Sequence, residues 1–187
     1  MRIRDKKKEQ LIIDAVITLA IDEGIQGLSI SKIAKKAKLA SATIYLYYEN
    51  KEALIKGVYI YVKDILRQYI NRNISITDSG QKVFEKLMSN LYTFIVERME
   101  YLLFIEMCSL NPSIANANTV AMFEPIFSIV ENKIKENTFK KIAPYILLSY
   151  CYNPIVQLAK DYRNNLIEDM EERFKYIKQL SWEAIKA

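Results

Sequence analysis

Apolar residues recur at helical spacing along most of the chain. From Glu9 onward, a stretch of about fifteen residues carries apolar side chains at the i, i+3, i+4, i+7 positions of an amphipathic helix. These apolar positions are Ile12, Ala15, Val16, Leu19 and Ala20. Gly24 is placed to end this helix. Similar patterns predict helices over about 51–73, from residue 78 or 79 onward, over 145–162 and over 165–186. Because only four Gly and four Pro interrupt 187 residues, we predict an all-α fold.

Two of the predicted helices follow each other closely between residues 28 and 51. Ser29 is placed to cap the first helix, whose apolar face is formed by Ile30, Ile33, Ala34 and Ala37. A turn at 38–40 follows, and then a helix over about 41–48 that is too short to be stable alone. This arrangement is typical of a helix-turn-helix.

Residues 9–55 resemble the N-terminal domain of the TetR family of bacterial transcriptional repressors. The resemblance rests on a first helix ending near Gly24, Leu-Ser at 28–29, Ile33-Ala34, Thr-Ile-Tyr-Leu-Tyr-Tyr at 43–48, and Asn-Lys-Glu at 50–52. It implies a TetR-like fold of about nine helices. The implied domains are a three-helix DNA-binding domain at 1–50, a connecting helix at 51–73, and a helical effector-binding and dimerisation domain at 74–187.

The resemblance also implies roles for residues of the helix-turn-helix. Thr43, Tyr47 and Lys51 match positions that contact DNA phosphates, while Ser41, Ala42 and Tyr45 or Leu46 would face base edges. Lys32, Lys35, Lys36 and Lys38 could line the flanking DNA backbone, although a solvated helix face explains any one of them equally well. Core packing is the alternative for Tyr45 and Tyr48, and for Tyr48 it is the preferred one.

The turn departs from the family pattern. The usual Gly, apolar residue and Ser cap are replaced by Lys38, Leu39 and Ala40. A left-handed backbone at Lys38 would cost roughly 1 kcal/mol more than at Gly. Ser41 is then the candidate cap of the second helix.

The positive charge is concentrated in the first part of the chain. The formal net charge is +5, but residues 1–72 contain 14 Lys or Arg against 8 Asp or Glu, whereas residues 73–187 contain 13 against 14. A basic region beside a neutral one indicates a nucleic-acid-binding module joined to a part with another role. The basic residues at 2–8 are either a solvated terminus or an arm that contacts DNA.

Several kinds of chemistry are excluded or disfavoured. The chain has no histidine, which excludes Ser-His and Cys-His catalytic pairs, zinc-finger sites and histidine-bound haem. Cys108 and Cys151 show no paired spacing. We therefore predict neither an enzyme nor a cofactor or metal. Because the chain shows no signal peptide or membrane span, we expect a cytoplasmic location.

The second part of the chain suggests an effector cavity. Residues 101–110 are apolar nearly all round except for Glu106, which either reaches the surface or faces a cavity, where a cationic ligand is one candidate partner. Pro125 and Pro154 are expected inside helices, where they would create kinks and leave space. The predicted lining is Phe104, Met107, Cys108, Phe123, Phe127, Tyr150 and Asn153; a tightly packed aromatic core is the alternative.

The final helix carries Leu166, Met170, Phe174, Ile177 and Ser181 at roughly heptad spacing. The family resemblance assigns the last two helices to a homodimer interface; packing within the chain is the alternative. The leading hypothesis is a repressor that binds a palindromic operator as a homodimer and is released by a small apolar or amphipathic effector. A helical DNA-organising or adaptor protein that senses no ligand is the second.

Overall fold

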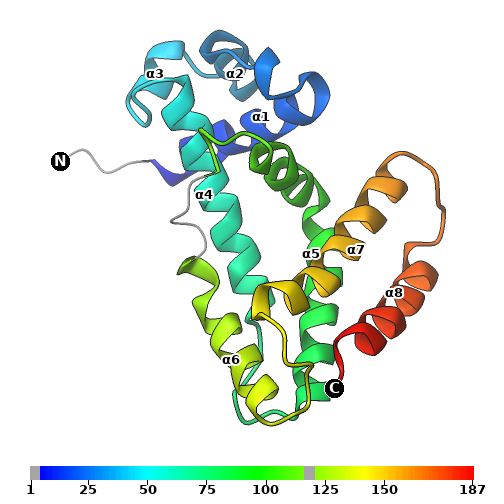
Figure 1. Ribbon diagram of the computed structural model, residues 1–187. Coiled ribbons are helices and arrows are strands. Elements are labelled where there is room, and N and C mark those ends of the chain that lie inside the picture. The colour runs from blue at the N-terminus through cyan, green and yellow to red at the C-terminus, as the bar shows by residue number, and fades with distance from the viewer. Residues whose placement is uncertain (1–4, 116–120) are drawn as a thin grey trace. The chain divides into compact units, whose positions relative to one another are not determined.

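The computed structural model describes residues 5–115 and 121–187, and in these residues every named element is a helix (Figure 1). The α-helices are α1 (Lys6–Glu23), α2 (Ile30–Ala37), α3 (Ser41–Tyr45), α4 (Lys51–Ile70), α5 (Gly80–Ser109), α6 (Glu124–Lys135), α7 (Pro144–Arg163) and α8 (Met170–Ile185). Two short 3₁₀ helices, η1 (Ile25–Gly27) and η3 (Ala121–Phe123), complete the set. The all-α prediction is confirmed. No helix in this part of the chain combines the length and apolar character needed to cross a membrane.

The chain forms two compact units. The first contains residues 1–64 and 103–119, and the second contains residues 65–102 and 120–187. Each of the helices α4 and α5 therefore contributes residues to both units. The limits of these packing units differ from the predicted domain boundaries at residues 50 and 73. The predicted boundaries separate parts of the chain by function, and they stay a prediction.

The first unit is built on the amphipathic helix expected at its start. Ile12 and Val16 of α1 are fully buried, and α1 packs against α2, which packs in turn against α3. Gly24 ends α1 with φ +77°, as its position predicted. The N-terminus of α4 is capped by Asn50, whose Oδ1 accepts a hydrogen bond of 2.8 Å from the Ala53 amide. These contacts position the helix-turn-helix.

The helix α5 is bent at a single residue. Arg98 has φ −144° and ψ 37°, outside the helical region, and it divides the 30 residues of α5 into two straight segments. The predicted separate helices from residue 79 and over 101–110 are these two segments, which is why eight α-helices are found among the described residues where about nine were expected. Neither Pro nor Gly marks the bend in the sequence.

The two prolines differ in their effect. Pro154 lies inside α7, as predicted, where it supplies no amide hydrogen to the helix. The expectation for Pro125 was wrong: Pro125 lies in the first turn of α6, where no intrahelical partner for an amide hydrogen is needed. Pro125 therefore starts a helix and creates no interior kink. The predicted loop at 115–119 lies almost entirely outside the described residues.

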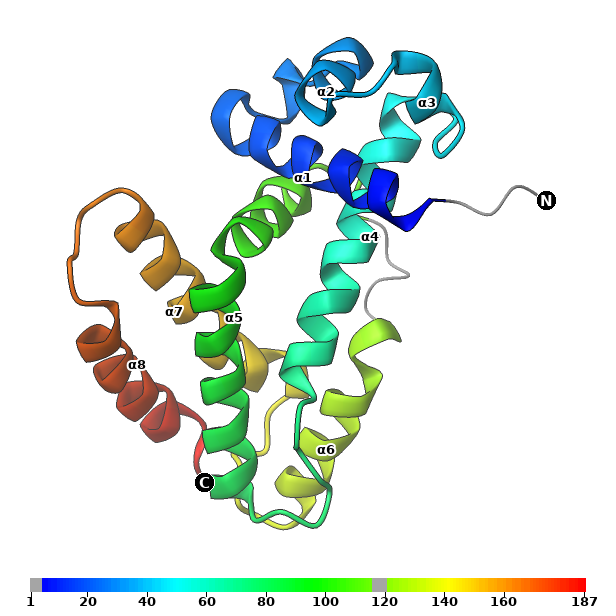
Figure 2. The ribbon, with the colours of Figure 1, turned by 180° about the vertical axis from the view of Figure 1, so that it is seen from behind.

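In the second unit α7 and α8 run side by side (Figure 2). The last helix begins at Met170, later than the predicted residue 165, because the Asp169 carboxylate caps it by accepting from the Glu172 amide at 2.7 Å. The Phe174 ring stacks on Tyr92 with 4.3 Å between centroids, and the Ser181 hydroxyl donates to the Tyr150 carbonyl at 2.7 Å. Phe174 and Ser181 of the predicted heptad stripe therefore pack within the chain.

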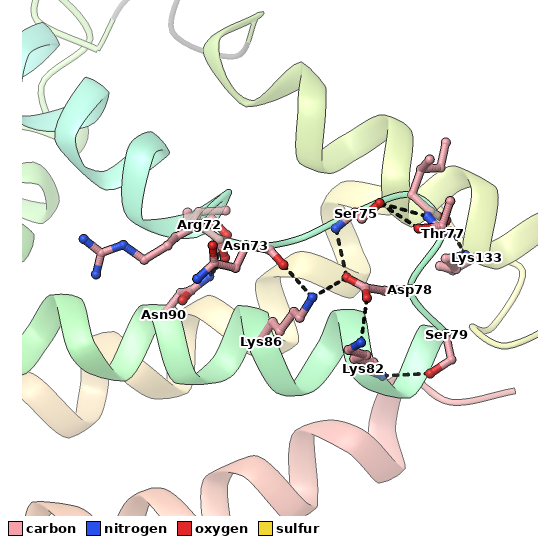
Figure 3. A network of polar contacts seen from close by, with 12 residues as sticks. Arg72, Asn73, Ser75, Thr77, Asp78, Ser79, Lys82, Lys86, Asn90 and Lys133 are labelled. Atoms are coloured by element: carbon pink, nitrogen blue, oxygen red, sulfur yellow. Dashed lines mark hydrogen bonds and ion pairs between the residues drawn. The ribbon is translucent and has the colours of Figure 1, made fainter.

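A network of charged groups fixes the connection between α4 and α5 (Figure 3). The nearly buried Asp78 carboxylate accepts hydrogen bonds from Lys86 Nζ at 2.6 Å and from the Ser75 amide at 2.9 Å, and it forms an ion pair with Lys82 at 3.2 Å. The hydrogen bonds from Lys86 and Ser75, in that order, hold the pKa of the Asp78 carboxyl well below its usual range.

Close packing holds the end of the same connection. A Cβ atom on Gly80 would lie 2.2 Å from Thr138 Cγ2, so only glycine fits at the start of α5. Lys133 of α6 is only 2% exposed and donates to the Ile76 carbonyl at 2.9 Å and to the Glu136 carboxylate. This buried ammonium therefore has one partner in the connection between α4 and α5 and another directly after α6.

We predict that Asp78→Asn lowers the stability of the chain in a pH-dependent way. A carboxyl whose folded-state pKa is depressed stabilises the fold above its unfolded pKa of about 3.9, and this contribution is lost as the pH falls. Chemical denaturation should show the variant less stable at pH 7 and the difference shrinking below about pH 4. Asp22→Asn, which changes an exposed aspartate, is the control. A difference that does not change with pH would contradict the ionic role of Asp78.

Candidate nucleic-acid interface

The first helix of the helix-turn-helix begins and ends as its sequence requires. The Ser29 side chain caps α2 by accepting from the Lys32 amide at 3.3 Å, which confirms the predicted cap. Lys38 follows α2 with φ 56° and ψ 41°, the left-handed conformation expected where the family has glycine. The Leu39 amide donates to the Ala34 carbonyl at 2.9 Å and closes the turn.

The second helix, α3, has only five residues and no side-chain cap. Ala40 occupies the N-cap position without a side-chain hydrogen bond, and Ser41 is the first helical residue, so the expectation that Ser41 caps the helix was wrong. Ile44 is completely buried and holds α3 against the rest of the unit. The α-helix ends at Tyr45 and not at Tyr48. Very few residues therefore decide which face of α3 is buried.

Exposure around α3 follows the helical phase set by Ile44. Tyr45 is 56% exposed and Leu46 is also exposed, whereas Tyr47 is only 9% exposed. The Tyr47 hydroxyl donates to the Asp5 carbonyl at 3.2 Å and ties the start of α1 to the end of α3. Tyr48 packs on α4, where a Cβ on Gly57 would lie 2.7 Å from its ring, in agreement with core packing. Tyr45 is thus the ring available to a ligand, and a phosphate contact by Tyr47 stays a prediction.

The structure brings most of the predicted DNA-contacting residues onto α2, α3 and the start of α4. Ser41 and Ala42 are exposed, and Thr43 is half-buried. Lys32 is tied to its own chain by bonds to the Glu23 carboxylate and the Gly27 carbonyl. Lys36 is exposed and Lys51 is half-buried, and within residues 5–115 and 121–187 neither forms an ion pair. Lys36 and Lys51 are therefore more readily available to phosphates than Lys32.

The predicted effector-lining residues are divided between the units. Phe104, Met107 and Cys108 belong to the first unit, whereas Phe123, Phe127, Tyr150 and Asn153 belong to the second, so no cavity inside one unit is lined by all seven. Tyr150 and Asn153 are exposed in the chain. A small apolar cavity of about 10 Å³ in the second unit is lined by Cys151 and other core residues, and it has no room for a ligand. The effector site stays a prediction.

The ionisable groups near this region have partners in the chain. Burial lowers the pKa of Lys63, and the nearby Glu106 carboxylate opposes that shift. Glu106 is half-buried and has a cation of the chain close to it, so it does not require a cationic ligand. Burial raises the pKa of Cys108 and of Cys151 to about 12, which keeps both thiols protonated and unreactive. In the described part of the chain no three His, Cys, Asp or Glu side chains gather as metal ligands would.

Comparison with known proteins places the N-terminal region in a family. Residues 12–58 match the model of bacterial regulatory proteins of the tetR family. The chain is 30% identical over 97 residues to the uncharacterized HTH-type transcriptional regulator YuxN of Bacillus subtilis, which covers 52% of this chain and 33% of that protein. It is 28% identical over 102 residues to IcaR of Staphylococcus epidermidis, the negative transcriptional regulator of the icaADBC biofilm operon, with 52% of each protein covered.

The similarity of fold extends beyond the aligned sequences. A TetR family transcription regulator from Marinobacter aquaeolei VT8 superposes with a TM-score of 0.84 and 25% identity, over 100% of this chain and 99% of that one. By contrast, the chain matches 33% of the length of YuxN and 52% of the length of IcaR. The fold thus agrees over the whole chain, while the match to the tetR family covers residues 12–58, which contain the helix-turn-helix.

We predict that Lys38→Gly stabilises the chain by about 1 kcal/mol. Glycine adopts the left-handed backbone of this position without the steric conflict that a Cβ atom introduces. The free energy of unfolding, measured by chemical denaturation, is the readout. The matched control is Lys36→Gly inside α2, which should destabilise by about 1 kcal/mol because glycine is a poor helix former. Equal destabilisation by both changes would show that the Lys38 backbone is not strained.

Proposed function

Because residues 12–58 match the tetR family and the fold agrees with a TetR family regulator over the whole chain, we propose that this chain is a TetR-type regulator that binds a palindromic operator as a homodimer and represses transcription there. We further propose that a small apolar or amphipathic effector releases it. Its relatives are transcriptional regulators, not enzymes, and IcaR is a negative one. Operator binding would place the protein with the bacterial chromosome in the cytoplasm.

The observation that carries the DNA-binding part is the exposed surface of α3. Ser41, Ala42, Tyr45 and Leu46 are all exposed on a helix whose opposite face is buried through Ile44. Exposed apolar and hydroxyl groups on the second helix of a helix-turn-helix are suited to base edges and thymine methyl groups in the major groove. Lys36 and Lys51, without ion pairs in the described residues, would hold the flanking phosphates.

The homodimer part is supported by exposed apolar side chains on and between the last two helices. The group consists of Tyr145, Tyr150, Tyr162, Leu166, Tyr176 and Leu180. Tyr176 and Leu180 lie on α8 away from Phe174 and Ser181, which are occupied by contacts within the chain. A second copy would cover these side chains and place two α3 helices on one operator.

Release by an effector would require that the effector bind the DNA-free geometry of the protein more tightly than the DNA-bound geometry. A ligand that prefers the geometry not bound to DNA by about 2 to 3 kcal/mol would lower operator affinity roughly thirty- to a hundredfold. Helix α4 starts with Lys51 near α3 and continues into the second unit, so it offers a covalent and helical route for such a change.

Lys51→Gln tests the proposed DNA surface. We expect the variant to bind genomic operator fragments and unrelated duplex DNA more weakly by the same factor, with the slope of log affinity against log salt reduced by about one. Fluorescence anisotropy at several salt concentrations measures both. Lys141→Gln removes an exposed lysine of the second unit and should change neither. Loss of operator binding alone, with the salt slope unchanged, would contradict a phosphate contact.

Leu180→Glu tests the proposed dimer. Sedimentation at micromolar concentration should show a dimer for the unmodified chain, and the variant should dissociate at least about tenfold more readily because a carboxylate would be buried at the interface. Leu110→Glu is the matched control, since Leu110 is 86% exposed but lies outside the last two helices. A monomer in the unmodified chain would overturn the two-fold arrangement.

A further inference from the structure

A groove of about 240 Å³ lies on the second unit, between α5 and α8, which are adjacent there (Figure 2). Its floor is aromatic: the rings of Phe84 and Trp182 lie 5.1 Å apart at an interplanar angle of 41°. The other lining residues are Gln81, Glu85, Lys175, Lys178 and Gln179. An apolar cavity of about 150 Å³ is sufficient to hold a benzene ring, so this groove has room for one ring and a short chain.

The walls of the groove are held in place before any ligand arrives. Trp182 also contacts the ring of Phe139, edge to face with 6.4 Å between centroids. The residue after α8 pairs with Phe139 in an isolated β-bridge, and Lys140 Nζ donates to the Ala184 carbonyl at 2.7 Å. Anchoring at the end of α8 fixes the position of Trp182, and a preformed site loses less entropy on binding.

The charges at the rim favour an anion. Lys178 is half-buried beside the aromatic floor, and no hydrogen bond or ion pair involves it within residues 5–115 and 121–187. Lys175 is well exposed and reaches Glu171 only at 3.9 Å. The single carboxylate in the lining, Glu85, already accepts from Gln81 Nε2 at 3.0 Å. Two ammonium groups thus face one engaged carboxylate around an apolar floor.

We propose that this groove binds small aromatic carboxylates, with the ring against Phe84 and Trp182 and the carboxylate paired with Lys178. The complementarity combines an apolar floor with an unpaired cation at its edge. The groove residues of α8 are 175, 178, 179 and 182, which lie on a different face of the helix from Tyr176 and Leu180. Dimer formation through Tyr176 and Leu180 is therefore compatible with an occupied groove, and the site is independent of DNA binding.

The test uses 3-phenylpropionate as the probe and its amide as the uncharged analogue. Trp182 is the only tryptophan, so its fluorescence reports directly on the groove. At constant ionic strength we expect saturable binding of the carboxylate with a dissociation constant on the order of 1 mM. The amide should bind roughly three- to tenfold more weakly, because it cannot pair with the Lys178 ammonium. Ligand-observed NMR provides a second measurement that does not depend on fluorescence.

Lys178→Gln should lower carboxylate affinity to that of the amide and leave amide affinity unchanged. Lys141→Gln, which removes the same charge outside the groove, should bind both probes as the unmodified chain does. Circular dichroism checks that each variant is folded. Equal affinity for the two probes, an unchanged Lys178→Gln variant, or no saturation by either method would overturn the proposal. These measurements do not involve operator DNA, so a negative result would contradict the groove proposal without contradicting the proposed function.

Discussion

The surface that we propose reads DNA depends on the burial of one isoleucine, Ile44. A helix of five residues has too few internal hydrogen bonds to be stable alone, so α3 exists only because Ile44 is fully buried. The side chains that follow Ile44 differ in exposure: Tyr45 and Leu46 are exposed, while Tyr47, in the turn after α3, is buried. The packing of α3 and the outward face that we propose reads DNA thus both follow from the burial of Ile44.

The sequence predicted the helix ends of the site better than it predicted which side chains are buried. Ser29 and Gly24 predicted the correct helix ends because each acts through a local hydrogen bond or a local backbone conformation. The burial of Tyr47 was not predicted, because the sequence Tyr-Leu-Tyr-Tyr at 45–48 offers little polar contrast from which to choose a buried face.

The parts of the fold that sequence could not supply depend on contacts between distant residues. The bend at Arg98 is not marked by a proline or glycine in the sequence. The residues around Lys133 likewise do not predict that its ammonium group is buried against the Ile76 carbonyl. The heptad spacing in 165–186 was real, but it did not distinguish a stripe that meets a second copy from one that meets Tyr92 in the same chain. Periodicity identifies an apolar face and leaves its partner undecided.

Contacts between distant residues also join the end of α4 to α5. The Asn90 side chain of α5 donates to the carbonyls of Ile70 at 3.2 Å and Arg72 at 2.8 Å, and Lys86 of α5 donates to the Asn73 carbonyl. The last turn of α4 is therefore bound to α5 through groups that would be left unsatisfied if the two helices separated. A displacement of α5 should accordingly move the end of α4, whose other end carries Lys51. In the proposed release, an effector held by the second unit would not need to touch DNA, provided that these three carbonyl contacts remain intact while α5 moves.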